Sequence, residues 1–132
     1  MPTVENLKFK ITDRKNKWVE VVGVKKNNVE TVIIPSSITT GGKEYKVTSI
    51  GERAFWGCES LTSITIPSSV TSIGDWAFAS CKSLTSINIP SSVTSIGEDA
   101  FWACSSLTSI NIPSSVTSIG EETFAGCSSL TS

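Results

Sequence analysis

Four cysteines at a constant interval are the first residues in this sequence that suggest chemistry. They recur every 23 positions, at Cys58, Cys81, Cys104 and Cys127. Four thiolates are a common zinc ligand set, but each sulfur must then lie about 2.3 Å from one ion. If the 23-residue units stack one strand spacing apart, about 4.8 Å, the outer cysteines are separated by roughly 14 Å or more. We therefore expect buried free thiols rather than a metal site, with a disulfide between neighbouring units as the alternative.

Acidic residues recur on the same interval and form a second candidate metal site. One acid per unit is joined by two more, giving the set Glu52, Asp75, Glu98, Asp99, Glu121 and Glu122. Calcium requires several oxygen ligands at one place. This spacing supplies about one carboxylate per unit and no dense loop of Asp, Asn and Gly. The row is therefore interpreted as a solvated edge, and no metal ligands are predicted.

The sequence offers few candidate catalytic residues, because it contains no histidine. Its absence excludes Ser-His-Asp and Cys-His nucleophile systems as well as histidine-ligated metals. Serine and threonine fill 38 of the 132 positions, but no activating partner accompanies any of them. Lysine is the only available base, and residues 51–132 contain a single one, Lys82. We predict that the protein is not an enzyme, with no catalytic residues, no cofactor-binding residues and no cofactor.

Charge is distributed unevenly along the chain. Residues 1–50 contain nine Lys and Arg against five acids, and residues 51–132 contain two against seven. A basic half is compatible with nucleic-acid binding. No aromatic-interleaved basic helix accompanies it, so the lysines are better explained as protection of exposed sheet edges. No apolar run reaches the ~18–20 residues of a membrane span, and the first residues lack the apolar core of a signal peptide. We predict no nucleic-acid partner and no membrane insertion.

The elements that position these residues follow from an internal repeat. Glycine, phenylalanine and leucine keep the same 23-residue interval as cysteine, and 18 of 23 positions are identical between residues 74–96 and 97–119. A unit of this length cannot bury its apolar face alone, so its copies must stack into a solenoid with one shared interior. Equivalent residues then form continuous columns, including a spine of Phe55, Phe78, Phe101 and Phe124.

Each unit is predicted to contain one short strand. Residues 61–66 place Ile64 and Ile66 on one face, and the equivalents 84–89 and 107–112 should pair with this strand in parallel. Pro67 ends the strand because it cannot donate to a ladder. Gly74 then permits a sharp corner, and the three-residue spacing of Phe, Cys and Leu suits one short helical turn.

The first 46 residues are predicted to form a cap made of two β-hairpins. Residues 7–11 and 18–24 alternate around a turn at 13–17, and residues 29–34 and 45–47 flank a Gly-Gly turn at 41–42. The expected organisation is therefore residues 1–46 as a β-hairpin N-terminal cap, and residues 47–132 as about three and a half repeat units. The chain ends in the middle of a unit, so its C-terminus is expected to be uncapped.

The unit Gly-x-x-Ala-Phe-x-x-Cys-x-Ser-Leu-Thr-Ser-Ile-x-Ile-Pro-Ser-Ser-Val-Thr-Ser-Ile resembles the leucine-rich repeats of the BspA-like surface proteins of bacteria and protists. The resemblance covers residues 47–132, and residues 34–51 match the way that family enters its first repeat. It implies a right-handed coil with short parallel strands on the concave face and short helical or 3-10 turns on the convex face. It also implies a non-catalytic adhesion module at the cell surface or outside the cell, which contacts a host, matrix or neighbouring-cell protein.

Two side surfaces are candidates for such contacts. The concave face is predicted to present only small uncharged residues: Ser63, Thr65, Ser86, Asn88, Ser109 and Asn111. Binding hot spots are enriched in Trp, Tyr and Arg, so this face is interpreted as inert. Trp56, Trp76 and Trp102 are predicted to lie on the convex side, where they form either an aromatic patch for a partner or scattered exposed rings.

The uncapped C-terminal end is the third candidate surface. A stack that stops here exposes apolar core and an unpaired strand edge. Either a longer array continues the stack, or another copy covers the end and makes a homodimer. The residues predicted to mediate this self-association are Leu107, Ile110, Ile112, Phe124 and Leu130. The alternative function is accordingly a structural repeat scaffold, consensus-like, engineered or truncated, without an evolved ligand.

Overall fold

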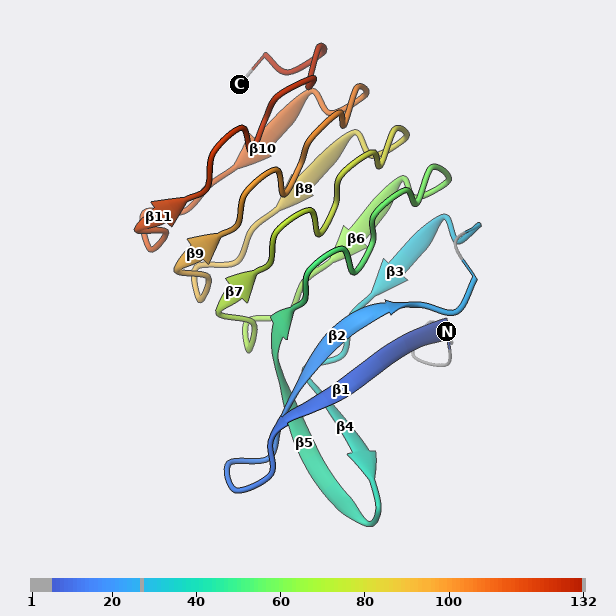
Figure 1. The fold of residues 1–132 in the computed structure, drawn as a ribbon, viewed down its shortest axis with the longest axis vertical. Helices are drawn as coiled ribbons and strands as arrows, with labels where there is room; N and C mark the ends of the chain where they lie inside the picture. The colour runs from blue at the N-terminus through green and yellow to red at the C-terminus, as the bar shows by residue number, and fades with distance from the viewer. Residues whose placement is uncertain (1–5, 27, 132) are drawn as a thin grey trace.

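The computed structural model describes residues 6–26 and 28–131 as a stack of similar rungs built almost entirely from short strands and turns (Figure 1). Successive rungs follow one another along the long axis, from two projecting hairpins at the N-terminal end to the C-terminus at the other (Figure 1). No helix in the described part is long and apolar enough to cross a membrane. The strands are β1 (Leu7–Asp13), β2 (Trp18–Val24), β3 (Thr31–Ile33), β4 (Ser37–Thr40), β5 (Lys43–Ile50), β6 (Ser63–Thr65), β7 (Ser72–Ile73), β8 (Ser86–Asn88), β9 (Ser95–Ile96), β10 (Ser109–Asn111) and β11 (Ser118–Ile119).

The 23-residue interval of the sequence is the register of the stack. Ser72 pairs with both Ser49 and Ser95, and Ile87 pairs with Ile110, all in parallel strands. One sheet has the order β1-β2-β5-β7-β9-β11, with β4 attached to β5, and the other pairings are β3 with β6 and β8 with β10. Each complete rung therefore contributes two strands. The sequence predicted only one, because β7, β9 and β11 are two residues long and leave almost no alternation to read.

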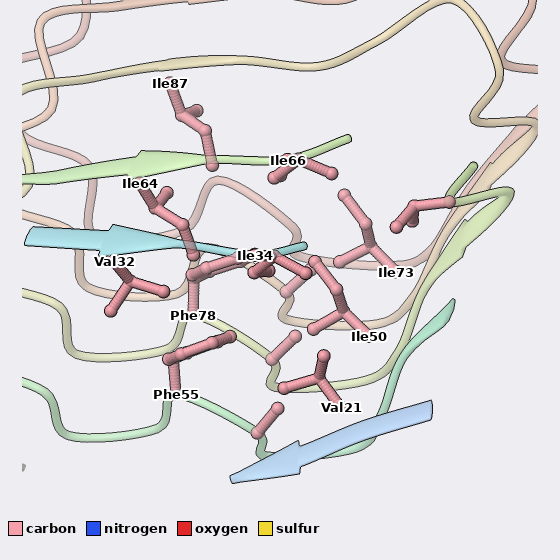
Figure 2. Close-up of a cluster of buried hydrophobic side chains, with 14 of the residues drawn as sticks. Val21, Val32, Ile34, Ile50, Phe55, Ile64, Ile66, Ile73, Phe78 and Ile87 are labelled. Atoms are coloured by element: carbon pink, nitrogen blue, oxygen red, sulfur yellow. The ribbon is translucent and has the colours of Figure 1, made fainter. Parts of the chain in front are cut away.

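The predicted spine of phenylalanines is confirmed. Neighbouring rings lie 5.3, 5.4 and 5.8 Å apart between centroids, with planes within 6° of parallel, from Phe55 through Phe78 and Phe101 to Phe124. Columns of aliphatic side chains run beside them: Figure 2 shows Val32, Ile64 and Ile87 along one line and Val21, Ile50 and Ile73 along another. The stacked copies thus share one interior.

The N-terminal hairpins are partly as predicted. β1 and β2 pair antiparallel around the turn at residues 14–17, as expected. The second hairpin pairs β5 with β4, not with residues 29–34. Within that segment, β3 instead lies parallel to β6, with Val32 opposite Ile64. The reason is that Ile34-Pro35-Ser36-Ser37 is already a copy of the repeat motif, so proline ends β3 and the chain enters the stack at that point.

The first rung therefore contains an insertion. Val32 and Ile64 pair across 32 positions, whereas Ile50 and Ile73 pair across 23, so this rung is longer by nine residues, equivalent to residues 38–46. The backbone N–H of Val47 donates to the carbonyl of Ser36 at 2.9 Å and closes the inserted loop at its base. The predicted boundary between residues 46 and 47 falls inside β5, which joins the hairpin to the stack without a break.

The segment between the Gly and Leu columns is a series of turns rather than a continuous helix. Bonds from N–H to the carbonyl three residues earlier are present, for example Cys58 to Phe55 at 3.2 Å. Residues with φ between 53° and 60° interrupt the series at Arg53, Trp76, Asp99 and Glu122. A left-handed residue cannot continue a right-handed helix, so the expected short turn is present but does not propagate.

The glycine column is needed for close packing rather than for a special backbone angle. Gly74 does not have a positive φ, although the sequence suggested a corner that depends on glycine's freedom. A Cβ at this position would lie 2.8 Å from the backbone nitrogen of Glu52 and 2.9 Å from the carbonyl carbon of Gly51. Only a residue without a side chain allows two rungs to approach this closely.

Candidate functional site

Most of the serine and threonine hydroxyls that donate hydrogen bonds in the described residues donate to a backbone carbonyl of the preceding rung. The Oγ1 atoms of Thr71, Thr94 and Thr117 each donate to the carbonyl of the threonine one rung earlier, at 3.2–3.3 Å. Ser92 and Ser115 donate in the same way to the carbonyls of Val70 and Val93, at 2.6 and 2.8 Å. These ladders account for part of the high serine and threonine content. They were not predicted from the sequence, although the constant spacing of these residues was the available signal.

The cysteines form a third such ladder. The Sγ atoms of Cys81, Cys104 and Cys127 donate to the carbonyls of Phe55, Phe78 and Phe101 at 3.1–3.2 Å, and all four cysteines are free. Burial raises the pKa of the Cys58 thiol to about 11 and that of Cys104 to about 12, and it raises the pKa of Cys81 as well. The reactive form is the thiolate, so these groups are poor nucleophiles and act as packing residues.

The carboxylates are spread along an edge. No group of three or more Cys, Asp or Glu side chains placed to hold a metal ion occurs in residues 6–26 and 28–131. Asp75 accepts the backbone N–H of Glu98 at 2.8 Å and thereby links two rungs. Glu52 pairs with Arg53 at 3.6 Å, but both side chains are more than 60% exposed, and such pairs contribute little to stability.

The predicted concave face lies on the outward side of β6, β8 and β10. The middle residue of each strand points inward, and the flanking serines, Thr65 and asparagines point outward, with Ser109 half-buried. Ile33, 54% exposed on β3 beside Thr65, adds one apolar residue to this face. The face has no charged or aromatic side chain at the six predicted positions.

Two of the three predicted tryptophans come together on the convex turns. The rings of Trp76 and Trp102 lie 5.7 Å apart at an angle of 60°, an edge-to-face contact between neighbouring rungs. Trp56 is 54% exposed and has no ring partner in the described part of the chain. The expected patch is thus a pair plus a separate ring. Trp76 occupies a left-handed position at φ 60°, which sequence spacing did not reveal.

The C-terminal rung is less covered than the others. Ile110, Ile112, Phe124 and Leu130 are half-buried there, whereas the equivalents of the first three in the preceding rungs are buried. Leu107, also predicted for this end, is fully buried and does not reach it. Ile119 on β11 is 47% exposed and belongs to this face, although the sequence did not single it out.

A groove that the sequence did not predict lies between the two N-terminal hairpins. It has a volume of about 470 Å³ and is lined partly by Phe9, Ile11 and Ile38, with Lys8 and Lys25 among the polar residues. The alternation of residues 7–11 predicted a strand of the first hairpin but no groove beside it. The two strands instead leave part of their apolar side chains against this groove.

The family model and the similar solved structures are all of leucine-rich repeat proteins. Residues 24–132 match the BspA type leucine rich repeat region in 6 copies, and no curated protein matches the chain. A leucine-rich repeat protein of Bacteroides ovatus is 42% identical over 92% of this chain, with a TM-score of 0.85. One from Bacteroides capillosus is 33% identical over 96%, with a TM-score of 0.86, and this match covers 91% of that protein.

A leucine-rich repeat protein of T. pallidum is also similar, with 31% identity over 96% of this chain and a TM-score of 0.86. The match spans about a third (32%) of the B. ovatus protein and 56% of the T. pallidum protein. Leucine-rich repeat proteins are generally non-enzymatic scaffolds that mediate protein interactions, and those of the BspA type are typically associated with the cell surface. On these grounds, the chain belongs to the BspA-type leucine-rich-repeat family.

Proposed function

We propose that this chain is a non-catalytic adhesion module of a cell-surface protein, which contacts its protein partner through the pair formed by Trp76 and Trp102. The observation that carries the proposal is this edge-to-face pair, in which Trp102 is 38% exposed. Tryptophan is among the residues most enriched at the centres of binding interfaces. The backbone of both residues is hydrogen-bonded, from the N–H of Trp76 to the carbonyl of Glu98 at 2.9 Å and from the N–H of Trp102 to the carbonyl of Asp99 at 3.1 Å, and a site ordered before binding loses less conformational freedom when a partner binds.

The test is solid-phase binding of the folded protein to a panel of immobilised extracellular-matrix proteins. We expect Trp102→Ser to abolish any saturable binding, and the control Trp56→Ser to leave it within twofold, since Trp56 is exposed but stacks on no other ring among the described residues. Equal effects of the two variants would refute the pair as the contact. Saturable binding that neither variant changes would place the contact on another face.

A second function is favoured by the half-buried C-terminal rung: a structural scaffold without an evolved ligand that self-associates through this end as a homodimer. Its support is the exposure of Ile119 and the partial burial of Phe124, where equivalent interior residues are buried. Sedimentation equilibrium should then show a dimer that Ile119→Lys converts to a monomer. Ile33→Lys is the matched control, because Ile33 is 54% exposed, slightly more than Ile119 at 47%, but lies on β3 at the other end of the stack. A monomer at all concentrations refutes this function.

A further inference from the structure

The groove between the two N-terminal hairpins continues into a second hollow. The groove, of about 470 Å³, and its neighbour, of about 240 Å³, share two lining residues, Ile11 of β1 and Thr40 of β4. The first part begins at Leu7, and the second reaches Arg14 in the turn that follows β1. Together they form one continuous groove along β1, the hairpin groove.

The two strands that border the hairpin groove each have a free edge. In the part of the chain that the structure describes, β1 (Leu7–Asp13) pairs only with β2, and β4 (Ser37–Thr40) pairs only with β5. Both belong to the hairpins that project from the N-terminal end of the stack (Figure 1). An edge strand leaves the N–H and C=O groups of alternate residues unpaired, and a further strand can bind to them.

The floor of the hairpin groove is apolar. Phe9, Ile11 and Ile38 line it and are half-buried, whereas Leu7 and Val19 are buried. The alternation along β1 places Phe9 and Ile11 on the face that packs toward the core. Because part of each side chain stays uncovered, a ligand with apolar groups of its own gains free energy by covering them.

The charged residues that line the hairpin groove are all cations, namely Lys8, Lys25, Arg14 and Lys43. None of these four forms an ion pair with an acid among residues 6–26 and 28–131. Two acids of the same hairpins are bonded elsewhere and do not line the groove. Asp13 accepts the backbone N–H and the side-chain amide of Asn16 at 2.9 Å, and Glu44 accepts the hydroxyl of Ser37 at 2.7 Å. Charge complementarity therefore favours an acidic ligand.

We propose that the hairpin groove binds an extended segment of a partner protein in which acidic and apolar residues alternate. The segment adds as a strand to the free edge of β1, its apolar side chains cover Phe9 and Ile38, and its carboxylates lie toward the cations. Lysines protect a sheet edge from pairing with another basic strand, but they attract an acidic one. A fatty-acid anion could cover the same floor, but it would leave both strand edges unpaired. This contact is separate from the tryptophan pair and goes beyond the adhesion function proposed above.

The experiment titrates a labelled peptide, acetyl-Glu-Val-Glu-Val-Glu-Val-Glu-amide, against the folded protein and follows fluorescence anisotropy at low and physiological salt. Its length matches the seven residues of β1. We expect saturable binding that Ile38→Glu weakens at least tenfold and that Lys8→Glu and Lys25→Glu each weaken about fivefold. The two lysines are exposed, so their variants remain informative if circular dichroism shows that Ile38→Glu does not fold.

The matched control is Lys15→Glu, which makes the same charge reversal at an exposed position of the same hairpin outside the groove. It should leave binding within twofold, and equal weakening by Lys15→Glu and Lys25→Glu would overturn the proposal, because it would mean diffuse attraction only. Trp102→Ser should also stay within twofold. Loss of matrix binding in that variant, with peptide binding kept, therefore tests the adhesion function and not this one.

Strand addition has a readout of its own. A peptide with proline in place of the central valine should bind at least tenfold more weakly, because proline removes a backbone donor. Hydrogen exchange should show new protection in β1 when the valine peptide is bound, and none in β9 or β11. Equal binding of both peptides, or a groove that binds dodecanoate but neither peptide, would overturn the proposal.

Discussion

The phenylalanine spine provides the sharpest test of how this stack is stabilised. Phe78 is fully buried, and both of its faces are covered by parallel rings at 5.3 and 5.4 Å. Phe124, at the end of the same column, is half-buried and has one ring neighbour at 5.8 Å. The same substitution at the two positions therefore removes different amounts of packing from chemically identical residues.

Phe78→Ala should lower the free energy of unfolding by about 4–5 kcal/mol. A buried Phe→Ala change typically costs about 3–5 kcal/mol, and loss of two stacked pairs places this site in the upper part of that range. Phe124→Ala should lower it by only about 1–2 kcal/mol, because less area is buried and the cavity opens to solvent. Against the ~5–15 kcal/mol typical of a whole domain, the first change removes a large fraction of the stability.

Urea titration followed by tryptophan fluorescence and far-UV circular dichroism measures both variants. Coincident transitions from the two probes license a two-state treatment, which repeat arrays do not always obey. Hydrogen exchange adds a spatial readout, since Phe124→Ala should release protection in the last rung alone. Equal losses for the two variants, or a larger loss for Phe124→Ala, would refute a core whose rungs depend on neighbours on both sides.

Two further outcomes follow from the columns. Gly74→Ala should destabilise the protein by about 1–3 kcal/mol, the usual range for overpacking, because the added Cβ would lie 2.8 Å from a backbone nitrogen. Gly23→Ala is the control, because its Cβ would meet nothing closer than 3.7 Å and the change should be nearly neutral. Thermal unfolding compares the two variants, and similar melting temperatures would contradict the close-packing argument. The free energy of unfolding should also fall as the pH rises above about 9. Burial raises the pKa of the Cys58 thiol to about 11 and that of Cys104 to about 12, from about 9 in the unfolded chain, so the unfolded chain loses these protons first. Each group should then lower the free energy of unfolding by about 1.4 kcal/mol per pH unit between its two pKa values. Urea unfolding under reducing conditions at pH 8–10.5 measures this slope, and an unchanged slope in Cys58→Ala/Cys104→Ala would show that the thiols are not its source.

The parts of the fold that could be predicted from sequence are those in which one residue type recurs on the repeat interval. A constant spacing gives Phe78 and Phe101 the same environment, so the spine and the register follow directly. Local pattern was less reliable at the first rung, where alternation in residues 29–34 fitted a hairpin as well as a stacked strand. The structure decides between them because Val32 pairs with Ile64, 32 positions away. The nine-residue insertion hid this pairing, since it breaks the 23-residue interval at the first rung.

The candidate surface was only partly accessible to the same reasoning. Spacing alone placed Trp56, Trp76 and Trp102 on one side of the turns, but which rings touch depends on the left-handed residues within them. The Oδ1 atom of Asp99 is shielded and accepts no hydrogen bond within the described part of the chain, and no sequence pattern distinguishes Asp99 from the exposed acids of the same row. The repetitive part of the fold can therefore be predicted from the sequence, whereas the features that differ between rungs cannot.

The nine-residue insertion in the first rung shows a position at which the stack tolerates additional residues. A hairpin enters between Ser37 and Val47, yet β3 and β5 on either side keep the alignment of the later rungs. The corresponding corners after Ser69, Ser92 and Ser115 have the same Ser-Ser-Val sequence. A loop inserted at these corners would therefore lengthen a rung without disturbing the phenylalanine spine.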